Sequence, residues 1–482
     1  MSLIIYFFKE YIFYINIIFV LVIILIEKRN PLYTLFWITI LLLTPYVGFV
    51  LYLFLGLKFR KRRVSEKFYK WKFSRSREII NTSERPDLFK WKQLISYLEV
   101  SSMNKLTSLN SLRLFTDGNK FFDKIKEDLK NAKESINVEY YIFKYDGLGQ
   151  DIVDILVDKA KEGVDVKVII DGASAVNKKI IKRITAAGGS VKRFFPWHFL
   201  FLRIASLRVN YRDHRKLTII DDKFAYIGGF NIGDEYLGKG KLGNWRDTGI
   251  RVFGEAVLEL KKEFYFSWGI VNKRDFVIED SKYAYETEVI ENLIADKGQH
   301  GAYVQVVSSG PNYQFRTMRD NFLKIILEAQ KYIYIQSPYF VPDESLLEAL
   351  KVAATSGITI KIMIPAVNDH VFMKWVNQYF AGELLEFGVE IYQYDKGFLH
   401  SKFIIADDEI ASVGTANFDY RSFYQNFEVN INIYQKEIVS SLREEFHNDM
   451  KHSKRLYTSQ YAKRSIWVKF KESIFRLLAP IL

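Results

Sequence analysis

Two stretches of the chain place a histidine, a lysine and an aspartate at the same spacing. The first reads HRKLTIIDDKFAYIGGFN and begins at His214, and the second reads HSKFIIADDEIASVGTAN and begins at His400. A constant offset of 186 residues joins the matching positions, including Asn231 and Asn417 near the ends of the two stretches. One such pattern is a weak signal in a chain of 482 residues, but two in one register indicate a duplicated unit that carries chemistry.

The residue types in these stretches suit a phosphodiester. Alternation along a β-strand puts His214 and Lys216 on one face, and the second stretch repeats this with His400 and Lys402. If the halves pack about a two-fold axis, two imidazoles and two ammonium groups meet at one site. The lysines and the two asparagines then hold the non-bridging oxygens, one imidazole attacks phosphorus to form a phosphohistidine, and the other transfers protons.

Four carboxylates follow the histidines in two pairs. A catalytic histidine needs an orienting carboxylate on its other ring nitrogen, and Asp247 and Glu428 follow their motifs at similar distances. The motif aspartates Asp221 and Asp407 belong to the candidate catalytic motif. Because they alternate onto the face opposite their histidines, we interpret them as anchors of a turn.

Two other interpretations of the histidines compete with this one. A lone His-x-Lys pair on a strand is usually a solvent-exposed face, but the duplication argues against that. Two histidines are also candidates for a metal site, but the adjacent lysines would repel a cation. We therefore expect no metal and no other cofactor.

Composition and charge exclude several classes of function. The chain has no cysteine, which rules out disulfides, thiolate metal sites and cysteine nucleophiles. The net charge is +13, but residues 58–92 carry +9, residues 451–482 carry +7, and residues 93–450 carry −4. A nucleic-acid enzyme concentrates positive charge on its working domain, so this distribution favours contact with an anionic membrane surface.

Two apolar runs near the N-terminus predict a transmembrane hairpin. We expect helices over about residues 4–26 and 33–57, with Pro45 and Gly48 tolerated inside the second. The basic run Arg60–Arg63 follows, so the positive-inside rule places the N-terminus and the body in the cytoplasm. The alternative is a cleaved signal peptide followed by a core helix, but the first run has no basic start and no small-residue cleavage site.

After residue 108 the pattern becomes α/β and occurs twice. Each half shows a helix, a strand, a second helix and a second strand; these are expected at 121–133, 135–143, 152–161 and 164–170, and again at 321–330, 332–340, 346–354 and 358–364. This predicts two similar α/β domains fused face to face. The expected divisions are a hairpin at 1–58, a basic linker at 59–108, domains at 109–275 and 276–460, and an amphipathic C-terminal helix at 461–482.

Two apolar segments allow more than one interpretation. Residues 194–202 read FFPWHFLFL and form either a buried loop or a hydrophobic lip beside a bilayer. The C-terminal helix has an apolar face opposite several lysines and arginines. That pattern suits a helix lying at a membrane interface, and equally a helix that packs on the protein itself.

The doubled motif resembles the phospholipase D superfamily, and more narrowly the bacterial cardiolipin synthases that carry two N-terminal membrane helices. The resemblance is carried by the hairpin that ends in TPYVGFVLYLFLG and by five further stretches: VEYYIF at 138–143, NYRDHRKLTIIDDKFAYIGGFNIGDEYLG at 210–238, WRDTG at 245–249, QSPYFVPD at 336–343 and HSKFIIADDEIASVGTANFDYRSF at 400–423. It implies two phospholipase D-like α/β domains with mixed sheets and flanking helices, related by a pseudo-two-fold axis.

The resemblance also implies an activity and a location. One phosphatidylglycerol would form a phosphatidyl-histidine at His214 and release glycerol, and a second would attack it to give cardiolipin, with His400 as acid and base. Glu139 and Gln336 occupy equivalent positions beside the site and would bind the headgroup or serve the structure. The implied partners are phosphatidylglycerol and the lipid bilayer, without nucleic acid. The implied location is the bacterial inner (plasma) membrane, multi-pass, with cytoplasmic catalytic domains.

Two rival functions use the same residues. Water competes with an alcohol for the intermediate, so a phospholipase D that hydrolyses phospholipid, or less readily a nuclease, fits the motifs as well. A membrane-anchored lipid-binding scaffold without catalysis is the other alternative, and the intact motifs in both halves argue against it.

Overall fold

The computed structural model describes residues 11–12, 14–21, 31–52, 88–172, 177–195, 211–272 and 301–477. The chain divides into two compact units. The smaller unit consists of residues 1–62 and 197–210, and the larger consists of residues 63–196 and 211–482.

The smaller unit is helical where it is described. Residues 14–21 are helical and are followed by α2 (Pro31–Leu43) and α3 (Pro45–Leu51). The buried Asn16 amide donates hydrogen bonds to the carbonyl oxygens of Leu41 (3.1 Å) and Pro45 (3.0 Å). The rings of Trp37 and Tyr52 pack edge to face at 5.3 Å, so this small unit has its own core.

The single helix expected over residues 33–57 is interrupted. Thr44 separates α2 from α3 with φ −129° and ψ 68°, and Pro45 is the first residue of α3. The pyrrolidine ring disfavours helical geometry at the residue before it, which accounts for the break at Thr44 between the two helices. Within the described residues no helix is both long and apolar enough to span a membrane.

The first half of the larger unit contains a seven-stranded mixed sheet. Its order is β2-β10-β8-β7-β3-β4-β5, with β3, β4 and β5 parallel and the other pairs antiparallel. The strands are β2 (Asn110–Phe115), β3 (Ser135–Tyr140), β4 (Asp165–Asp171), β5 (Ser190–Phe194), β7 (Lys216–Ile220), β8 (Phe224–Gly228) and β10 (Gly249–Gly254).

The second half repeats this order strand for strand. Its path β11-β20-β18-β17-β12-β14-β15 is extended by β1 (Leu106–Thr107) at one edge and β21 (Ser453–Leu456) at the other. The strands are β11 (Val304–Ser309), β12 (Tyr332–Gln336), β14 (Thr359–Pro365), β15 (Glu390–Tyr394), β17 (Phe403–Ala406), β18 (Ile410–Gly414) and β20 (Asn426–Ile433). The larger unit therefore contains two similar α/β domains with mixed sheets.

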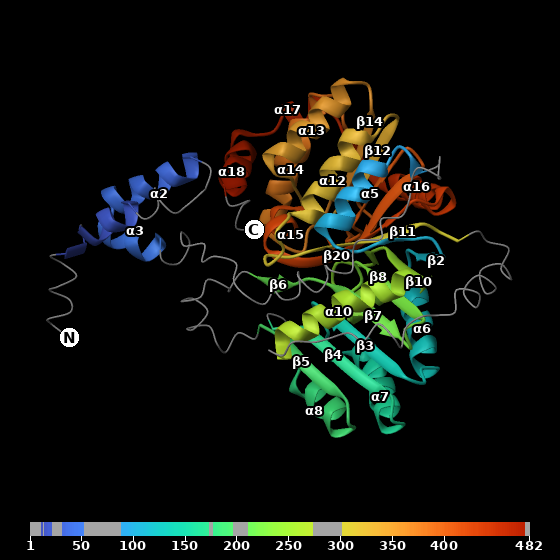
Figure 1. Cartoon of the computed structure of the whole chain (residues 1–482). Helices are drawn as coiled ribbons and strands as arrows, with labels where there is room; N and C mark the ends of the chain where they lie inside the picture. The colour runs from blue at the N-terminus through green and yellow to red at the C-terminus, as the bar shows by residue number, and fades with distance from the viewer. Residues whose placement is uncertain are drawn as a thin grey trace. The chain divides into compact units, whose positions relative to one another are not determined.

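Helices cover both sheets, and Figure 1 shows α10 and α16 beside the strands of their own halves. The first half has α6 (Gly118–Lys130), α7 (Gly147–Lys161), α8 (Lys178–Ala186), α10 (Ala256–Asn272) and the short 3-10 helix η5 (Asp234–Leu237). The second half has α12 (Thr317–Glu328), α13 (Glu344–Thr355), α14 (Val371–Leu385), α15 (Tyr420–Tyr424), α16 (Lys436–Met450), α17 (Thr458–Ala462) and α18 (Ile466–Leu477).

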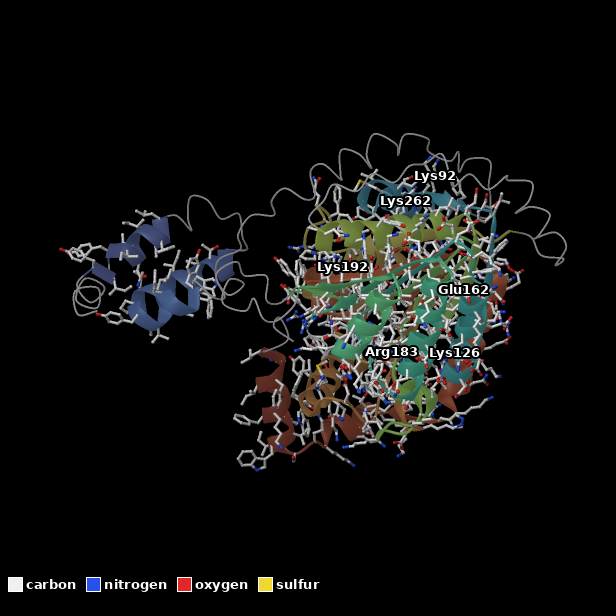
Figure 2. All side chains as sticks on the ribbon, turned by 90° about the horizontal axis from the view of Figure 1, so that it is seen from below. Lys92, Lys126, Glu162, Arg183, Lys192 and Lys262 are labelled. Carbon is white, nitrogen blue, oxygen red and sulfur yellow. The ribbon has the colours of Figure 1, made fainter. Side chains whose placement is uncertain are left out.

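The two domains share one hydrophobic core. Leu217 of β7 and Phe264 of α10 belong to the same buried cluster as Val306 of β11, Phe403 of β17 and Phe446 of α16. Two further clusters lie under the remaining helices of each half. Figure 2 shows charged side chains such as Lys126 and Arg183 on the outside of the first half.

The C-terminal part of the expected linker is folded into the second domain. Helix α5 (Lys92–Ser101) follows Trp91, which is fully buried among the helices and strands of that half. Strand β1 pairs with β11 of the same sheet. Residues 88–107 therefore act as part of the domain rather than as a linker, because their apolar side chains are needed to complete its core.

Several sequence expectations fall on residues outside the described ranges. The division at 275/276 is one of them, and so are residues 196–202 of the apolar segment. Its first residue, Phe194, is buried, and its ring packs edge to face on Phe427 at 5.1 Å. The start of that segment is thus part of the shared core.

Candidate active site

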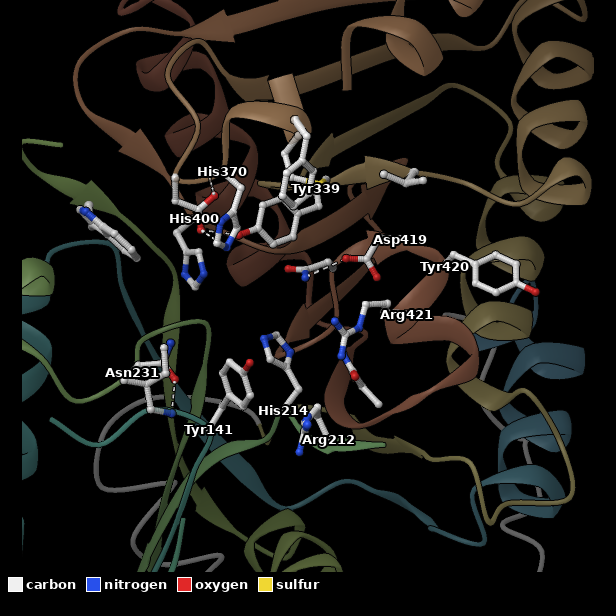
Figure 3. Close-up of a pocket in the computed structure, with 18 of the residues that line it drawn as sticks. Tyr141, Arg212, His214, Asn231, Tyr339, His370, His400, Asp419, Tyr420 and Arg421 are labelled. Atoms are coloured by element: carbon white, nitrogen blue, oxygen red, sulfur yellow. Dashed lines mark hydrogen bonds and ion pairs between the residues drawn. The ribbon is translucent and has the colours of Figure 1, made fainter. Parts of the chain in front are cut away.

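The two motifs meet at a single pocket between the halves, with a volume of about 320 Å³ (Figure 3). Its walls carry both motif histidines and both motif asparagines. The remaining lining residues are Tyr141, Ile142, Arg212, Tyr236, Trp245, Tyr339, Val341, Asp369, His370, Phe372, Met373, Asp419, Tyr420, Arg421 and Asn426.

Three two-residue strands, together with β20, bring the histidines together. Strand β6 (Arg212–Asp213) pairs with β20, and the backbone N–H of His214 donates to the carbonyl of Phe427 (3.0 Å). Strand β9 (Trp245–Arg246) pairs with β16 (Phe398–Leu399), and the backbone N–H of His400 donates to the carbonyl of Arg246 (2.8 Å). Each histidine is therefore held by backbone from the other half.

The orienting carboxylates cross over in the same way. Nδ1 of His214 lies 2.9 and 3.0 Å from the two carboxylate oxygens of Glu428, and Nδ1 of His400 lies 2.6 Å from Oδ2 of Asp247. Both carboxylates are fully buried. Because each occupies Nδ1, the reactive position of each ring is Nε2.

The surroundings of the two rings control their charge. Burial, with Lys402 and Lys216 nearby, lowers the pKa of both histidines from 6.5 to about 4. Both imidazoles are therefore neutral near pH 7 in the ligand-free site. A bound phosphodiester brings negative charge, which favours protonation of one ring.

The two lysines are buried directly behind the histidines and do not themselves line the pocket. Lys216 Nζ donates to the carbonyl oxygen of His214 (2.6 Å), and Lys402 makes the equivalent contact with His400. Burial lowers the pKa of Lys216 to about 7 and that of Lys402 to about 8, from 10.5. Each lysine also contributes to the lowered pKa of the histidine in the other half, so all four groups share one electrostatic environment.

The two asparagines line the pocket and are held by hydrogen bonds. Asn231 accepts from the backbone N–H of Ile142 (3.1 Å) and donates to the Tyr236 hydroxyl (2.7 Å). Asn417 donates to the Asp419 carboxylate (3.0 Å). Their amides are thus fixed in position in the wall of the pocket.

Neither motif aspartate lines the pocket. Asp221 accepts hydrogen bonds from three successive backbone N–H groups, at residues 133 to 135, and Asp407 does the same at residues 330 to 332. Both have a positive φ, 51° and 59°, in the turn after the motif strand. They tie that turn to the start of the neighbouring strand, so a direct catalytic role for either carboxylate has no geometric basis.

Glu139 and Gln336 lie behind the pocket, outside its lining. Burial raises the pKa of Glu139, which lies near Asp213 and Arg215. Gln336 donates to the Asp449 carboxylate (2.9 Å), and Asp449 also pairs with Arg246 (2.9 Å). Headgroup binding by either residue therefore lacks a geometric basis, whereas the structural alternative agrees with their positions.

Sequence reasoning missed several lining residues. Tyr141, Arg212 and Arg421 lie inside the quoted motifs, and that neighbourhood was the available signal. The rings of Tyr141 and His214 lie 5.0 Å apart. Asp369 and His370 had no such signal, because they belong to a connection without any motif.

The arrangement suits covalent catalysis on a phosphodiester. Two neutral imidazoles present Nε2 to one pocket, each with a buried carboxylate on Nδ1. Two cationic lysines can neutralise the non-bridging oxygens of a phosphate between them. The site can therefore form and break a phosphorus–nitrogen bond while moving a proton to and from an oxygen.

Comparisons with known proteins agree with this geometry. Residues 125–264 and 322–450 match the family described as "Cardiolipin synthase, PLD-like domain", and residues 15–56 match "Phospholipase_D-nuclease N-terminal". The chain is 41% identical to a cardiolipin synthase of Oceanobacillus iheyensis, covering 98% of both chains. It is 42% identical to a cardiolipin synthase of Clostridium perfringens, covering 95% of this chain and 96% of the relative.

A solved structure shares the fold. The crystal structure of phosphatidylserine synthase from Haemophilus influenzae superposes with a TM-score of 0.59 at 17% identity. The match covers 81% of this chain and 96% of that one. At this identity the likeness concerns the architecture of the two domains alone.

Proposed function

This chain belongs to the bacterial cardiolipin synthases of the phospholipase D superfamily, and from that membership we propose that it joins two phosphatidylglycerol molecules into cardiolipin and releases glycerol. The observation that carries the mechanism is the crossed pair of Nδ1–carboxylate contacts around one pocket. They leave two Nε2 atoms, one for attack and one for proton transfer.

The first half-reaction forms the intermediate. Nε2 of His214 attacks phosphorus of the donor lipid, a phosphorus–nitrogen bond forms, and the bond from phosphorus to the glycerol oxygen breaks. His400 gives its proton to that oxygen, so neutral glycerol leaves. Lys216 and Lys402 hold the non-bridging oxygens.

The second half-reaction reverses the roles of the groups. The free hydroxyl of a second phosphatidylglycerol gives its proton to His400, and its oxygen attacks phosphorus. The phosphorus–nitrogen bond breaks, which restores neutral His214 and yields cardiolipin. Atoms and charge balance without an external oxidant, reductant or energy source.

The surroundings of His214 support its role as nucleophile. Burial opposes ionisation of Glu428, but His214 and Lys216 hold its pKa below the ordinary value. A firmly ionised carboxylate keeps the proton on Nδ1 and stabilises the positive charge that the imidazole gains when Nε2 bonds phosphorus. Glu428 contacts His214 with both oxygens, whereas His400 meets one oxygen of Asp247.

The finer assignments from the sequence belong to the same proposal. We propose that the N-terminal segment anchors the chain in the bacterial inner membrane, with the catalytic domains on the cytoplasmic side. The match of residues 15–56 to an N-terminal family model and the apolar sequence there support this. The repeated strand order supports two domains, and we propose their division at residues 275/276, with residues 88–107 added to the second domain.

Product analysis with the purified chain tests this function. The full-length protein is reconstituted with phosphatidylglycerol as the only phospholipid, and lipids and glycerol are quantified. The proposal expects equal amounts of cardiolipin and glycerol. Phosphatidic acid without cardiolipin would indicate a hydrolase and contradict it.

A further inference from the structure

Two arginines line the pocket and take no part in the steps above. Arg212 lies on β6 of the first half, and Arg421 lies on α15 of the second. Figure 3 shows both beside His214, on the side away from His400. The reacting groups and these arginines therefore occupy different parts of one pocket.

The fold holds both arginines in place. In the β6–β20 pairing Arg212 is opposite Asn426, and its guanidinium lies 3.9 Å from Asp171. Arg421 lies in the short helix that Asp419 caps through the N–H of Ser422. Burial raises the pKa of the Tyr141 hydroxyl, and both arginines act against that rise, so both lie near the same wall.

The chemistry of the reaction requires a second anion site. The reacting phosphate meets Lys216 and Lys402, but the phosphate of the acceptor lipid is not consumed and keeps its charge into the product. A second anion held beside the reacting phosphate, partly removed from water, needs cations of its own. Guanidinium groups bind phosphate oxygens with two parallel hydrogen bonds, which suits this task.

We propose that Arg212 and Arg421 form a subsite for the unreacted phosphodiester of the acceptor lipid. The subsite holds that phosphate while the acceptor hydroxyl reacts at the phosphohistidine, and it thereby favours an anionic phospholipid over water or a neutral alcohol. The inference rests on the proposed function, since it assigns the second substrate of that reaction.

The test compares two acceptors for one intermediate. Full-length Arg421→Gln in phosphatidylglycerol vesicles is given ethanol, and cardiolipin and phosphatidylethanol are quantified together. Ethanol carries no phosphate, so the ratio of cardiolipin to phosphatidylethanol should fall about tenfold or more. Arg183→Gln on the outer helix α8 is the matched control and should keep the wild-type ratio.

Each outcome decides a different point. An unchanged ratio in Arg421→Gln and in Arg212→Gln overturns the subsite. An equal loss of both products overturns it too, because the arginine would then act on the donor. Wild-type protein that forms neither product contradicts the proposed function itself. Arg421→Lys should recover part of the ratio that Arg421→Gln loses, since lysine keeps the positive charge but cannot make two parallel hydrogen bonds to a phosphate.

A separate observation concerns α18, whose inner face carries both Glu472 and Phe475. Glu472 is only 2% exposed and pairs with Arg464, while Phe475 stacks on Phe372 of α14 at 6.5 Å. Phe372 and Met373 of α14 line the pocket. The inner face of α18 is thus fixed to the pocket wall through one helix.

The outer face of α18 is apolar and exposed. Five large apolar side chains there are between 43% and 74% exposed: Ile466, Trp467, Phe470, Ile474 and Leu477. With about 3.6 residues per turn they lie opposite Glu472. Lys469 borders one edge of the stripe, and Lys471 borders the other edge above the Trp375 ring of α14. Arg476 lies further round the helix, against Tyr379 of α14. Water is a poor environment for this stripe, whereas an anionic lipid surface satisfies both its apolar centre and its basic edges.

We infer that this stripe, residues 466, 467, 470, 474 and 477, lies in the interface of an anionic bilayer and holds the pocket wall at the lipid surface. The flanking cations favour an anionic bilayer over a neutral apolar partner. This contact is separate from the N-terminal segment and does not depend on it.

The absence of cysteine in the chain allows a direct test. Phe470→Cys in the full-length protein is labelled with an environment-sensitive fluorophore and reconstituted with vesicles that contain phosphatidylglycerol and a lipid-bound quencher. The label should shift to the blue and be quenched. Asp123→Cys on the outside of α6 is the control and should do neither.

Two results would overturn the bilayer contact. One is a Phe470→Cys label that stays unquenched in anionic vesicles. The other is a label already shielded in detergent at high protein concentration and released on dilution, which would indicate a second copy of the chain on the stripe.

Discussion

The two halves of the site differ at the position that follows the first glycine of each turn. In the first half this position is Gly229, and a Cβ there would lie 2.0 Å from Oδ1 of Asp247. In the second half it is Thr415, whose hydroxyl donates to Glu428 (2.6 Å). The shorter side chain of Asp247 lies next to glycine, and the longer side chain of Glu428 lies next to threonine. Each thus reaches Nδ1 of its own histidine.

The difference extends to the support of each carboxylate. Glu428 accepts from the hydroxyls of Thr415 and Ser422 and from the amide of Asn426. Asp247 accepts from the backbone N–H of Thr248 (2.7 Å). The better-supported carboxylate faces His214, which we propose to carry the covalent intermediate. A near-symmetric fold thus provides two histidines with unequal electrostatic support.

The largest expected effect is a loss of rate when either orienting carboxylate is replaced, and the two replacements should slow different parts of the first step. Glu428→Gln should slow the first step by about 10² to 10⁴-fold with any leaving group, because the imidazole loses its charge partner. Asp247→Asn should slow glycerol release similarly but leave p-nitrophenolate release much less affected, since that anion needs no protonation. Stopped-flow release from the two donors measures both.

Equal sensitivity of Glu428→Gln and Asp247→Asn with the p-nitrophenyl donor would contradict the unequal roles.

The next effect concerns the glycine that admits Asp247. Gly229→Ala should reduce kcat by about a hundredfold, because its Cβ displaces the carboxylate from Nδ1 of His400. Thr415→Gly, at the matching position of the other half, should cost far less, since it removes a hydrogen bond without displacing Glu428. Thermal unfolding of both variants serves as the folding control. A smaller loss of kcat in Gly229→Ala than in Thr415→Gly would contradict this difference between the two halves.

A third prediction uses the unequal lysines. Burial lowers the pKa of Lys216 to about 7 and of Lys402 to about 8, so raising the pH through this window removes the charges that hold phosphate. With a p-nitrophenyl donor kcat/KM should therefore fall from about pH 7 upward. In Lys216→Arg the fall should begin about one pH unit higher, near the pKa of Lys402. A kcat/KM that stays constant from pH 7 to above pH 9 would refute this assignment.

The smallest effect is expected from Thr415→Val. The variant removes one neutral donor to Glu428, while the Ser422 hydroxyl and the Asn426 amide remain. One net hydrogen bond is worth about 1 kcal/mol, so kcat should fall about fivefold. Steady-state cardiolipin formation measures it, with Thr355→Val on the exposed end of α13 as control. A loss above a hundredfold would mean that this hydroxyl does more than support the carboxylate.

Repetition made much of the fold predictable from the sequence. Each helix and strand expected around the motifs has a counterpart, for example α7 at Gly147–Lys161 and β4 at Asp165–Asp171. The ends moved by a few residues, because capping by Asp146 begins α7 earlier than its apolar pattern does. The family assignment is confirmed by the matches to both domains and to full-length relatives.

The sequence did not predict which carboxylate contacts which histidine. Spacing suggested Asp247 and Glu428 as orienting groups, but only their contacts with Nδ1 show that each serves the histidine of the other half. The same holds for Arg212 and Arg421, which are 209 positions apart in the chain. Strand alternation predicts which face of the sheet Glu139 lies on, but not how far it lies from the pocket. In the structure Glu139 is fully buried and does not line the pocket.

The central claim is that His214 carries the intermediate and His400 moves protons. It is tested most directly by quenching His400→Asn and His214→Asn with a p-nitrophenyl phosphatidyl donor and mapping the phosphorylated peptide by mass spectrometry. The account predicts stoichiometric phosphatidyl on His214 in His400→Asn, because the leaving group needs no acid and no base remains to activate the acceptor. Phosphatidyl on His400 in His214→Asn, with none on His214 in the other variant, would contradict it.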